Sequence, residues 1–183
     1  SASLIQCEPP TVISGRSLED VRKHVAVSNI HYVGNHGLEI AYPDGRQKIN
    51  VFRARTGELK KIIQNVKGFL KGLPGILFEE KGPIFSIHFR NAPQASWESI
   101  RQGLEEELQQ WRGRWRMASG KMVFEIQPNI DFNKGKAVRD ILKKFGHQDI
   151  LPICLGDDRT DEDAFRAVKD EGISVFVGAA DSP

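Results

Sequence analysis

The segment that decides the fold lies near the end of the chain and reads Leu155-Gly156-Asp157-Asp158-Arg159-Thr160-Asp161-Glu162-Asp163-Ala164-Phe165. An apolar run at 150–155, typical of a buried strand, leads into it, and a helical pattern at 161–168 follows. In an open parallel sheet, ligands bind outside the carboxyl ends of the strands. Asp157 and Asp158 therefore stand at a predicted ligand site, where adjacent carboxylates suit a hard cation such as Mg²⁺.

The other acidic residues of this segment have a simpler interpretation. Thr160 is placed to cap the following helix, with Asp163 at the third position of a capping box. The helix dipole also favours carboxylates in the first turn. We therefore expect Asp163 only to stabilise the N-terminus of the helix. This interpretation does not extend to Asp157 and Asp158, because they precede the helix.

Outward from this segment, strands and helices alternate at both ends of the chain. Further apolar strands are predicted at 10–13 and 173–177, and helices at 18–25 and 136–145. Near-continuous apolar strands that alternate with helices indicate a parallel sheet covered by helices. The predicted fold class of these two ends is α/β.

The middle of the chain has a different pattern. Amphipathic helices are predicted at 56–70 and 96–111, and the run at 84–90 alternates strictly between apolar and polar side chains. Such alternation means that one strand face is buried and the other is presented. The pattern predicts an α+β unit with its helices on one face of an antiparallel sheet. The predicted domains are a core at 1–43 and 129–183 and an inserted cap at 44–128.

Two further motifs suit an anionic ligand. Ser14-Gly15 follows the first strand and precedes a helix, so a hydroxyl and backbone amides would converge there. Lys134-Gly135 stands at the start of the helix predicted at 136–145, where a lysine neutralises phosphate as a compact point charge. Each motif alone is also compatible with an ordinary solvated turn. Their combination with the aspartates at 157 and 158 is far more specific.

Taken together, these motifs resemble the second, third and fourth motifs of the haloacid dehalogenase phosphatases. More narrowly, nearly the whole chain from residue 10 onward resembles the trehalose-phosphate phosphatase family. The stretches that carry this resemblance are Ile13-Ser14-Gly15-Arg16, Gly34-Asn35-His36-Gly37, residues 81–90 (KGPIFSIHFR), Asn133-Lys134-Gly135-Lys136 and residues 156–165 (GDDRTDEDAF). The resemblance implies an incomplete haloacid dehalogenase-like core with the inserted cap.

The resemblance also implies a function and a set of site residues. It implies Mg²⁺-dependent hydrolysis of trehalose 6-phosphate through an aspartyl-phosphate, with Asp157 as the metal ligand and Asp158 as its partner. Ser14 and Lys134 would stabilise the phosphoryl oxygens. The substrate-binding residues that it implies are Arg16, Asn35, His36, Lys81, His88, Arg90, Glu125 and Asn133.

The chain departs from the family in two respects: Gln127 stands where the family more often has an arginine before the proline, and the other departure bears on activity. The family's first motif, Asp-x-Asp-Gly-Thr, carries the nucleophile and the general acid/base, and no such run occurs in the 183 residues. Asp44-Gly45 does not replace it, because no apolar strand precedes that turn. We therefore expect the chain by itself not to turn over substrate. A phosphatase of sucrose phosphate or mannosylglycerate phosphate remains an alternative. Another is a non-catalytic module that binds sugar phosphate or docks on a trehalose-phosphate synthase.

Composition narrows the class of protein. The 26 basic and 24 acidic residues leave a net charge of +2, which is too balanced to favour nucleic acid or an anionic membrane as a partner. Neither a run of about 18 apolar residues nor a signal peptide occurs in the sequence. The two cysteines, Cys7 and Cys154, have no metal-ligand spacing and are predicted to be buried free thiols. A cytoplasmic protein is the resulting expectation.

Overall fold

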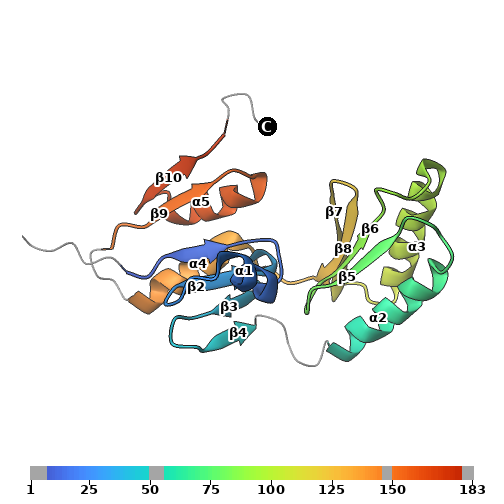
Figure 1. Cartoon of the computed structure of the whole chain (residues 1–183), viewed down its shortest axis with the longest axis horizontal. Coiled ribbons are helices and arrows are strands. Elements are labelled where there is room, and N and C mark those ends of the chain that lie inside the picture. The colour runs from blue at the N-terminus through green and yellow to red at the C-terminus, as the bar shows by residue number, and fades with distance from the viewer. Residues whose placement is uncertain (1–7, 50–55, 146–149, 179–183) are drawn as a thin grey trace, which may run out of the picture. The chain divides into compact units, whose positions relative to one another are not determined.

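The computed structural model describes residues 8–49, 56–145 and 150–178, which form two compact units (Figure 1). The core unit contains the described residues up to 49 and from 132 onward, and the cap unit contains residues 56–131. The cap unit begins and ends a few residues later than the sequence predicts. It begins later because β4 (Gln47–Ile49) pairs with β3 (Glu39–Ala41) and so belongs to the core sheet.

The first part of the core unit is a four-stranded sheet with helices on both faces. β1 (Thr11–Ile13) pairs in parallel with β2 (His31–Gly34), and the antiparallel strands β3 and β4 complete the order β1-β2-β3-β4. α1 (Leu18–Val25) packs on the side of Tyr32, and α4 (Lys134–Leu142) packs on the side of Val33. The period of two along β2 thus sends alternate side chains to two different helices.

The second part of the core unit is a β-α-β unit. β9 (Ile153–Gly156) and β10 (Ile173–Phe176) are parallel neighbours, and α5 (Glu162–Val168) connects them. α5 packs against α4 through a cluster that Ile13 of β1 and Cys154 of β9 also contact. Cys154, predicted to be buried, is only half-buried, although burial still raises the pKa of its thiol, and Cys7 lies outside the described residues.

The predicted burial of the strands at 150–155 and 173–177 is wrong for the described structure. α5 covers only the face of β9 that carries Cys154, so the alternate residues of β9 are exposed, with Leu155 at 68%, and all four residues of β10 are exposed. The predicted sheet is also not continuous. β9 pairs only with β10, and β1 pairs only with β2, among the described residues. An apolar strand is buried only when neighbours cover both of its faces, which its own sequence does not determine.

The cap unit is a four-stranded antiparallel sheet covered on one face by two helices. Its strands are β5 (Leu77–Glu80), β6 (Phe85–His88), β7 (Trp115–Gly120) and β8 (Val123–Pro128), in the order β5-β6-β8-β7. α2 (Thr56–Phe69) and α3 (Trp97–Gln109) pack on the face of Phe85 and Ile87, which confirms the predicted alternation of β6. The opposite face carries the polar residues. No helix in the described ranges is long and apolar enough to cross a membrane.

Candidate active site

Ser14 lies directly after β1 and is held by the backbone of the neighbouring strand. Its amide donates to the carbonyl of Val33 at 2.9 Å, and its hydroxyl accepts from the amide of Arg16 at 3.1 Å. A Cβ atom on Gly15 would lie 2.5 Å from the ring of His36, so the His36 side chain packs directly on the backbone of Gly15. The predicted residues Ser14 and His36 are therefore brought together at the carboxyl ends of β1 and β2.

The turn that carries His36 reaches the start of α4. Asn35, His36 and Gly37 all have positive φ angles, of 49°, 57° and 110°. A Cβ atom on Gly37 would lie 2.8 Å from the carbonyl oxygen of Asn133, so the turn packs closely on the N-terminus of α4. Asn133 caps that helix, since its side-chain oxygen accepts from the amide of Lys136 at 2.9 Å. The structure thereby gives Asn133 a structural role, and its contact with substrate stays a prediction.

Asn35 has a structural role as well. It is fully buried, and its side-chain amide donates to the carboxylate of Glu39. Burial raises the pKa of Glu39, although hydrogen bonds from the Leu18 amide and from Asn35 oppose that change. Contact of Asn35 with substrate, which the resemblance implies, stays a prediction.

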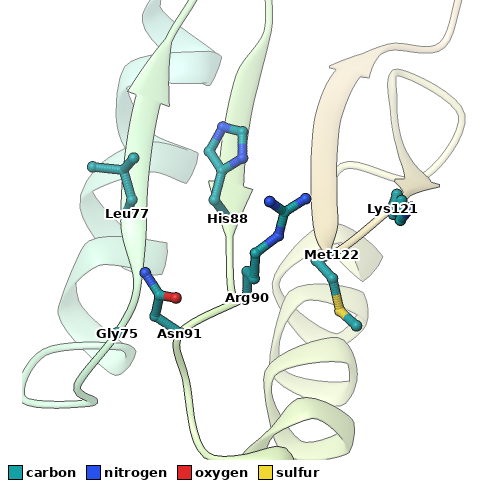
Figure 2. A pocket seen from close by; sticks show the side chains of 7 residues that line it. All are labelled: Gly75, Leu77, His88, Arg90, Asn91, Lys121 and Met122. Carbon is teal, nitrogen blue, oxygen red and sulfur yellow. The ribbon is translucent and has the colours of Figure 1, made fainter.

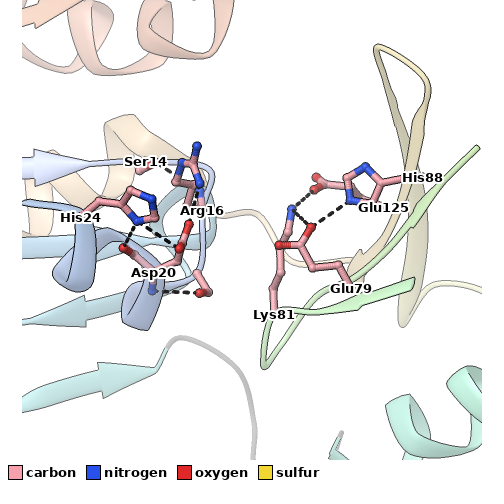
Figure 3. Close-up of polar contacts among 9 residues, drawn as sticks. Ser14, Arg16, Asp20, His24, Glu79, Lys81, His88 and Glu125 are labelled. Carbon is pink, nitrogen blue, oxygen red and sulfur yellow. Dashed lines mark hydrogen bonds and ion pairs between the residues drawn. The ribbon is translucent and has the colours of Figure 1, made fainter. Parts of the chain in front are cut away.

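Arg16, the other predicted residue of this loop, is exposed and pairs with Asp20 of α1 at 2.7 Å (Figure 3). Hydrogen bonding from Arg16 lowers the pKa of Asp20, which also lies 3.1 Å from His24. Because the pair is exposed, it contributes little to stability and leaves the guanidinium accessible to solvent. Substrate binding by Arg16 stays a prediction.

Lys134 is the first residue of α4, and its side chain is only 8% exposed. Its ammonium donates to one oxygen of Asp161, whose side chain is 14% exposed, at 2.7 Å. The other oxygen of Asp161 accepts the amides of Asp157 at 3.2 Å and Asp158 at 3.1 Å. A single carboxylate thus connects the predicted phosphate-binding lysine to the loop that carries the predicted metal ligand.

Asp161 is a site residue that the sequence interpretation missed. The predicted cap of α5 by Thr160 with Asp163 is wrong: the N-cap residue of α5 is Asp161, and a capping box of Asp158 and Asp161 instead closes the short 3₁₀ turn Arg159–Asp161 before it. The spacing Asp-x-x-Asp was the available signal. Burial opposes ionisation of Asp161, but the hydrogen bonds from Lys134 and from the two amides outweigh it and lower its pKa. Asp161 is therefore held as a carboxylate.

Asp157 and Asp158 are exposed at the carboxyl end of β9, as predicted. The Asp158 side chain serves the capping box and accepts from the Thr160 hydroxyl at 3.4 Å, whereas the Asp157 side chain bonds no other described residue. No group of three or more His, Cys, Asp or Glu side chains in the described ranges is arranged to hold a metal ion. Two carboxylates nevertheless fit Mg²⁺, which takes one or two and fills its other positions with water and phosphate oxygens.

Gly135 permits the close approach of α4 and α5, and this yields a prediction. A Cβ atom there would lie 2.2 Å from the carbonyl oxygen of Asp163, a backbone atom that cannot rotate away. We expect Gly135→Ala to lower the free energy of unfolding by about 1–3 kcal/mol, because overpacking outweighs the better helix propensity of alanine. Amide hydrogen exchange in α4 measures the loss.

Gly68 of α2 is the matched control, because a Cβ atom there would contact nothing within 4 Å. Gly68→Ala should stabilise α2 by about 0.5–1 kcal/mol. A gain in stability from both substitutions would show that the contact between Gly135 and Asp163 does not constrain the two helices.

Lys81, His88 and Glu125, three of the four residues predicted in the cap, lie close together with Glu79 (Figure 3). Lys81, only 11% exposed, donates to Glu125 at 3.0 Å and lies 3.5 Å from Glu79. Glu79 in turn lies 2.9 Å from His88, and the buried hydroxyl of Ser86 donates to Glu125 at 3.1 Å. Because Glu79, Ser86 and Glu125 are cross-strand neighbours, β5, β6 and β8 each contribute to one polar network.

Two members of this network were missed or misplaced by the sequence interpretation. Glu79 was missed, and its position in β5 two residues before Lys81 was the signal that could have identified it. Ser86 was expected on the presented face of β6, yet its neighbours cover it completely. Arg90 lies beyond the last residue of β6 and outside the network, and no hydrogen bond or ion pair joins it to another described residue.

Known proteins of one family are similar to this chain over most of its length. The family model for Trehalose-phosphatase matches residues 7–182. The chain is 32% identical to trehalose-phosphate phosphatase B of Arabidopsis thaliana over 176 residues, which cover 90% of this chain and 47% of that protein. It is 35% identical to trehalose-phosphate phosphatase of Mycobacterium marinum over 176 residues, covering 94% and 44% of the two chains.

A solved structure shows the same fold. The crystal structure of a trehalose-6-phosphate phosphatase related protein superposes with a TM-score of 0.78 at 23% identity, covering 94% of this chain and 71% of that one. The haloacid dehalogenase-like α/β core with an inserted α+β cap is therefore confirmed. The chain spans about half the length of the curated relatives that it matches. From the match over residues 7–182, the chain belongs to the trehalose-phosphatase family.

Proposed function

We propose that this chain forms the cap and the phosphate- and metal-binding part of a phosphatase that hydrolyses trehalose 6-phosphate to trehalose and phosphate. The observation that carries the proposal is the bridge made by Asp161. Its two carboxylate oxygens join the buried ammonium of Lys134 to the backbone of Asp157 and Asp158. A phosphate-binding cation and exposed carboxylates are thereby fixed in one cluster. Preorganised charges of this kind are the main contribution of a protein to phosphoryl transfer.

Within this proposal the core residues have separate tasks. An ammonium has three donors, so Lys134 can bind Asp161 and phosphoryl oxygens together. The hydroxyl of Ser14 would donate to another phosphoryl oxygen. Asp157, with Asp158 beside it, would hold Mg²⁺, which when bound would neutralise charge on the phosphoryl group. The close packing of Gly37 and Gly135 would keep these groups in place without reorganisation.

The attacking aspartate is assigned to the family's Asp-x-Asp-Gly-Thr motif, which does not occur among the 183 residues. The fold offers a position for a strand that carries it. Ile13 of β1 and Cys154 of β9 contact the same cluster, yet no hydrogen bond between strands joins β1 to β9 among the described residues. An apolar strand paired there would cover part of the exposed surface of β9. Attack on phosphorus would break its bond to the sugar oxygen, release trehalose and form an aspartyl-phosphate, which water would hydrolyse to phosphate and the free aspartate.

The polar network of the cap is assigned to the sugar. Lys81, Glu79, Glu125 and His88 provide donors and acceptors that are already held by one another, and sugar hydroxyls could extend their hydrogen bonds. A site built to bond hydroxyls rejects substrates that leave its polar groups unpaired. This discrimination would separate trehalose 6-phosphate from sucrose and mannosylglycerate phosphates.

The test is phosphate release by the protein at its natural full length, with Mg²⁺, from trehalose 6-phosphate, sucrose phosphate, mannosylglycerate phosphate and p-nitrophenyl phosphate. We expect trehalose 6-phosphate to be preferred. Glu125→Gln should lower kcat/KM for it about 10- to 100-fold, because a hydrogen bond to a charged group is lost. Hydrolysis of the aryl phosphate, which needs only the core residues, should barely change.

Glu106→Gln on α3 is the matched control, because Glu106 is exposed and bonds no other described residue. It should leave both substrates unaffected. Preference for another sugar phosphate would overturn the substrate assignment. Binding of a sugar phosphate without release of phosphate would favour the non-catalytic module instead. If Glu125→Gln lowered kcat/KM equally for both substrates, a role of Glu125 in binding the sugar would be excluded.

A further inference from the structure

The turn at 35–37 has a conformation that its own residues do not favour. Asn35 and His36 both have φ in the left-handed region, at 49° and 57°, where the side chain is crowded by its own backbone. Such a conformation persists only where the surroundings impose it. The turn matters for the candidate site, because the amide of His36 donates to the carbonyl of Ser14 at 3.0 Å and its ring packs on Gly15.

One side chain bonds both to this turn and to the helix beside it. Glu39, the first residue of β3, points to the sheet face that α1 covers, as Ala41 does. A single oxygen of its carboxylate accepts the side-chain amide of Asn35 and, at 3.4 Å, the backbone amide of Leu18. Gly34, the cross-strand neighbour of Glu39, packs so closely on Leu18 that a Cβ atom would lie 2.4 Å from the same amide nitrogen. Glu39 therefore ties the turn to the start of α1.

The carboxylate of Glu39 is held at this position without a counter-charge. No lysine, arginine or histidine among the described residues pairs with it, and burial raises its pKa. A carboxylate that is partly removed from water is costly unless hydrogen bonds compensate for the lost solvation. The amides of Asn35 and Leu18 supply this compensation, so the position of the carboxylate and the position of the turn depend on each other.

The surroundings of Glu39 differ from those of a ligand-binding charge. A charged side chain that binds a ligand has to be accessible, as Arg90 and Lys121 are in a pocket of about 240 Å³ in the cap (Figure 2). Glu39 is only half-exposed, and the oxygen that accepts both hydrogen bonds faces protein donors. It is therefore placed to act on the turn and not on substrate.

We propose that Glu39 is a positioning residue for phosphoryl transfer, which acts through Asn35 on the turn that holds Ser14. This inference rests on the proposed function, in which the hydroxyl of Ser14 donates to a phosphoryl oxygen. The acceptor oxygen of Glu39, and not its negative charge, is what fixes the turn. A displacement of about 1 Å in a catalytic group costs on the order of 10²-fold in rate. The effect should therefore fall on kcat and not on KM.

Three substitutions at Glu39 separate the acceptor from the charge. Glu39→Gln keeps an oxygen that can accept both amides and removes the charge, whereas Glu39→Met has a similar length and no comparable acceptor. Glu39→Asp keeps the charge but withdraws the oxygen by one methylene, and this smaller change tests the same point if Glu39→Met does not fold.

The test is hydrolysis of p-nitrophenyl phosphate with Mg²⁺ by the protein at its natural full length. Glu39→Met should lower kcat about 10- to 100-fold and leave KM within about threefold of wild type, because binding of the small substrate is retained while the site is displaced. Glu39→Asp should lower kcat about tenfold. Glu39→Gln should keep kcat within about threefold of wild type, which a role for the charge would not allow.

Val21→Ala is the matched control for a loss of stability. Val21 lies in the apolar cluster between α1 and the core sheet, and among the described residues it forms no hydrogen bond to the turn or to Glu39. Its truncation weakens the same unit and should leave kcat unchanged at a temperature where the protein is folded. Equal losses of kcat in Val21→Ala and Glu39→Met would overturn the proposal. So would unchanged turnover in Glu39→Met, or a loss in Glu39→Gln as large as in Glu39→Met.

A ¹H–¹⁵N NMR comparison of the same full-length variants keeps this inference separate from the proposed function. Glu39→Met should shift the amides of Ser14 and His36, and Glu39→Gln should leave both near their wild-type positions. If the wild type released no phosphate from any substrate, the proposed function would fail, and these shifts would decide whether Glu39 positions Ser14. Unchanged amides of Ser14 and His36 in Glu39→Met would overturn the inference.

Discussion

Asp161→Asn is expected to lower the free energy of unfolding of the core unit by about 3 kcal/mol at pH 7, because it leaves the buried ammonium of Lys134 without its counter-charge. The substitution also removes one acceptor from the amides of Asp157 and Asp158. Hydrogen exchange of α4 and α5 amides measures the loss. All three tryptophans, Trp97, Trp111 and Trp115, belong to the cap unit, so their fluorescence checks that the cap is unaffected.

The loss should depend on pH in a defined direction. The pKa of Asp161 is lowered in the folded chain, so its contribution is fully present above the ordinary carboxyl pKa of about 4 and is lost as the pH falls through the folded value. The difference between wild type and Asp161→Asn should therefore shrink in acid. Asp170→Asn, which removes an exposed carboxylate without a described partner, should stay within about 0.5 kcal/mol of wild type. A loss that is constant with pH would contradict the ion-pair explanation.

Asp157→Asn is expected to reduce phosphate release from trehalose 6-phosphate by about 10²- to 10³-fold in the protein at its natural full length, the usual cost of one electrostatic contact in a transition state. The Asp157 side chain is exposed and bonds no other described residue, so stability should stay within about 0.5 kcal/mol of wild type. Activity measured against Mg²⁺ concentration should also show a weaker dependence on the metal.

Asp163→Asn separates this effect from a general loss of negative charge. Asp163 lies in the first turn of α5 and pairs with the exposed Arg166 at 3.3 Å. Its replacement should cost about 0.3–1 kcal/mol of helix stability and leave turnover intact. Similar metal titrations for the two variants would mean that the roles of Asp157 and Asp163 had been assigned wrongly.

The sequence by itself determined the features that depend on local spacing. Period-two alternation at 84–90 predicts which face of β6 is buried, and the spacing of apolar residues predicts α2 and α3 within a few residues. The strand followed by Gly156 and two aspartates places Asp157 at the carboxyl end of β9. Alternation of strands and helices also predicts the fold class. These signals are strong because they depend on neighbours a few positions apart.

Only the tertiary structure decided which side chains bond to one another when they are far apart in the sequence. Lys134 and Asp161 are 27 positions apart, and Lys81 and Glu125 are 44 apart, so no local pattern reveals either ion pair. The exposure of Leu155 likewise depends on whether a second layer covers β9, because the side chain is apolar in either case. Period and turn chemistry act locally, whereas burial and hydrogen-bond partners are properties of the surroundings that the whole chain creates.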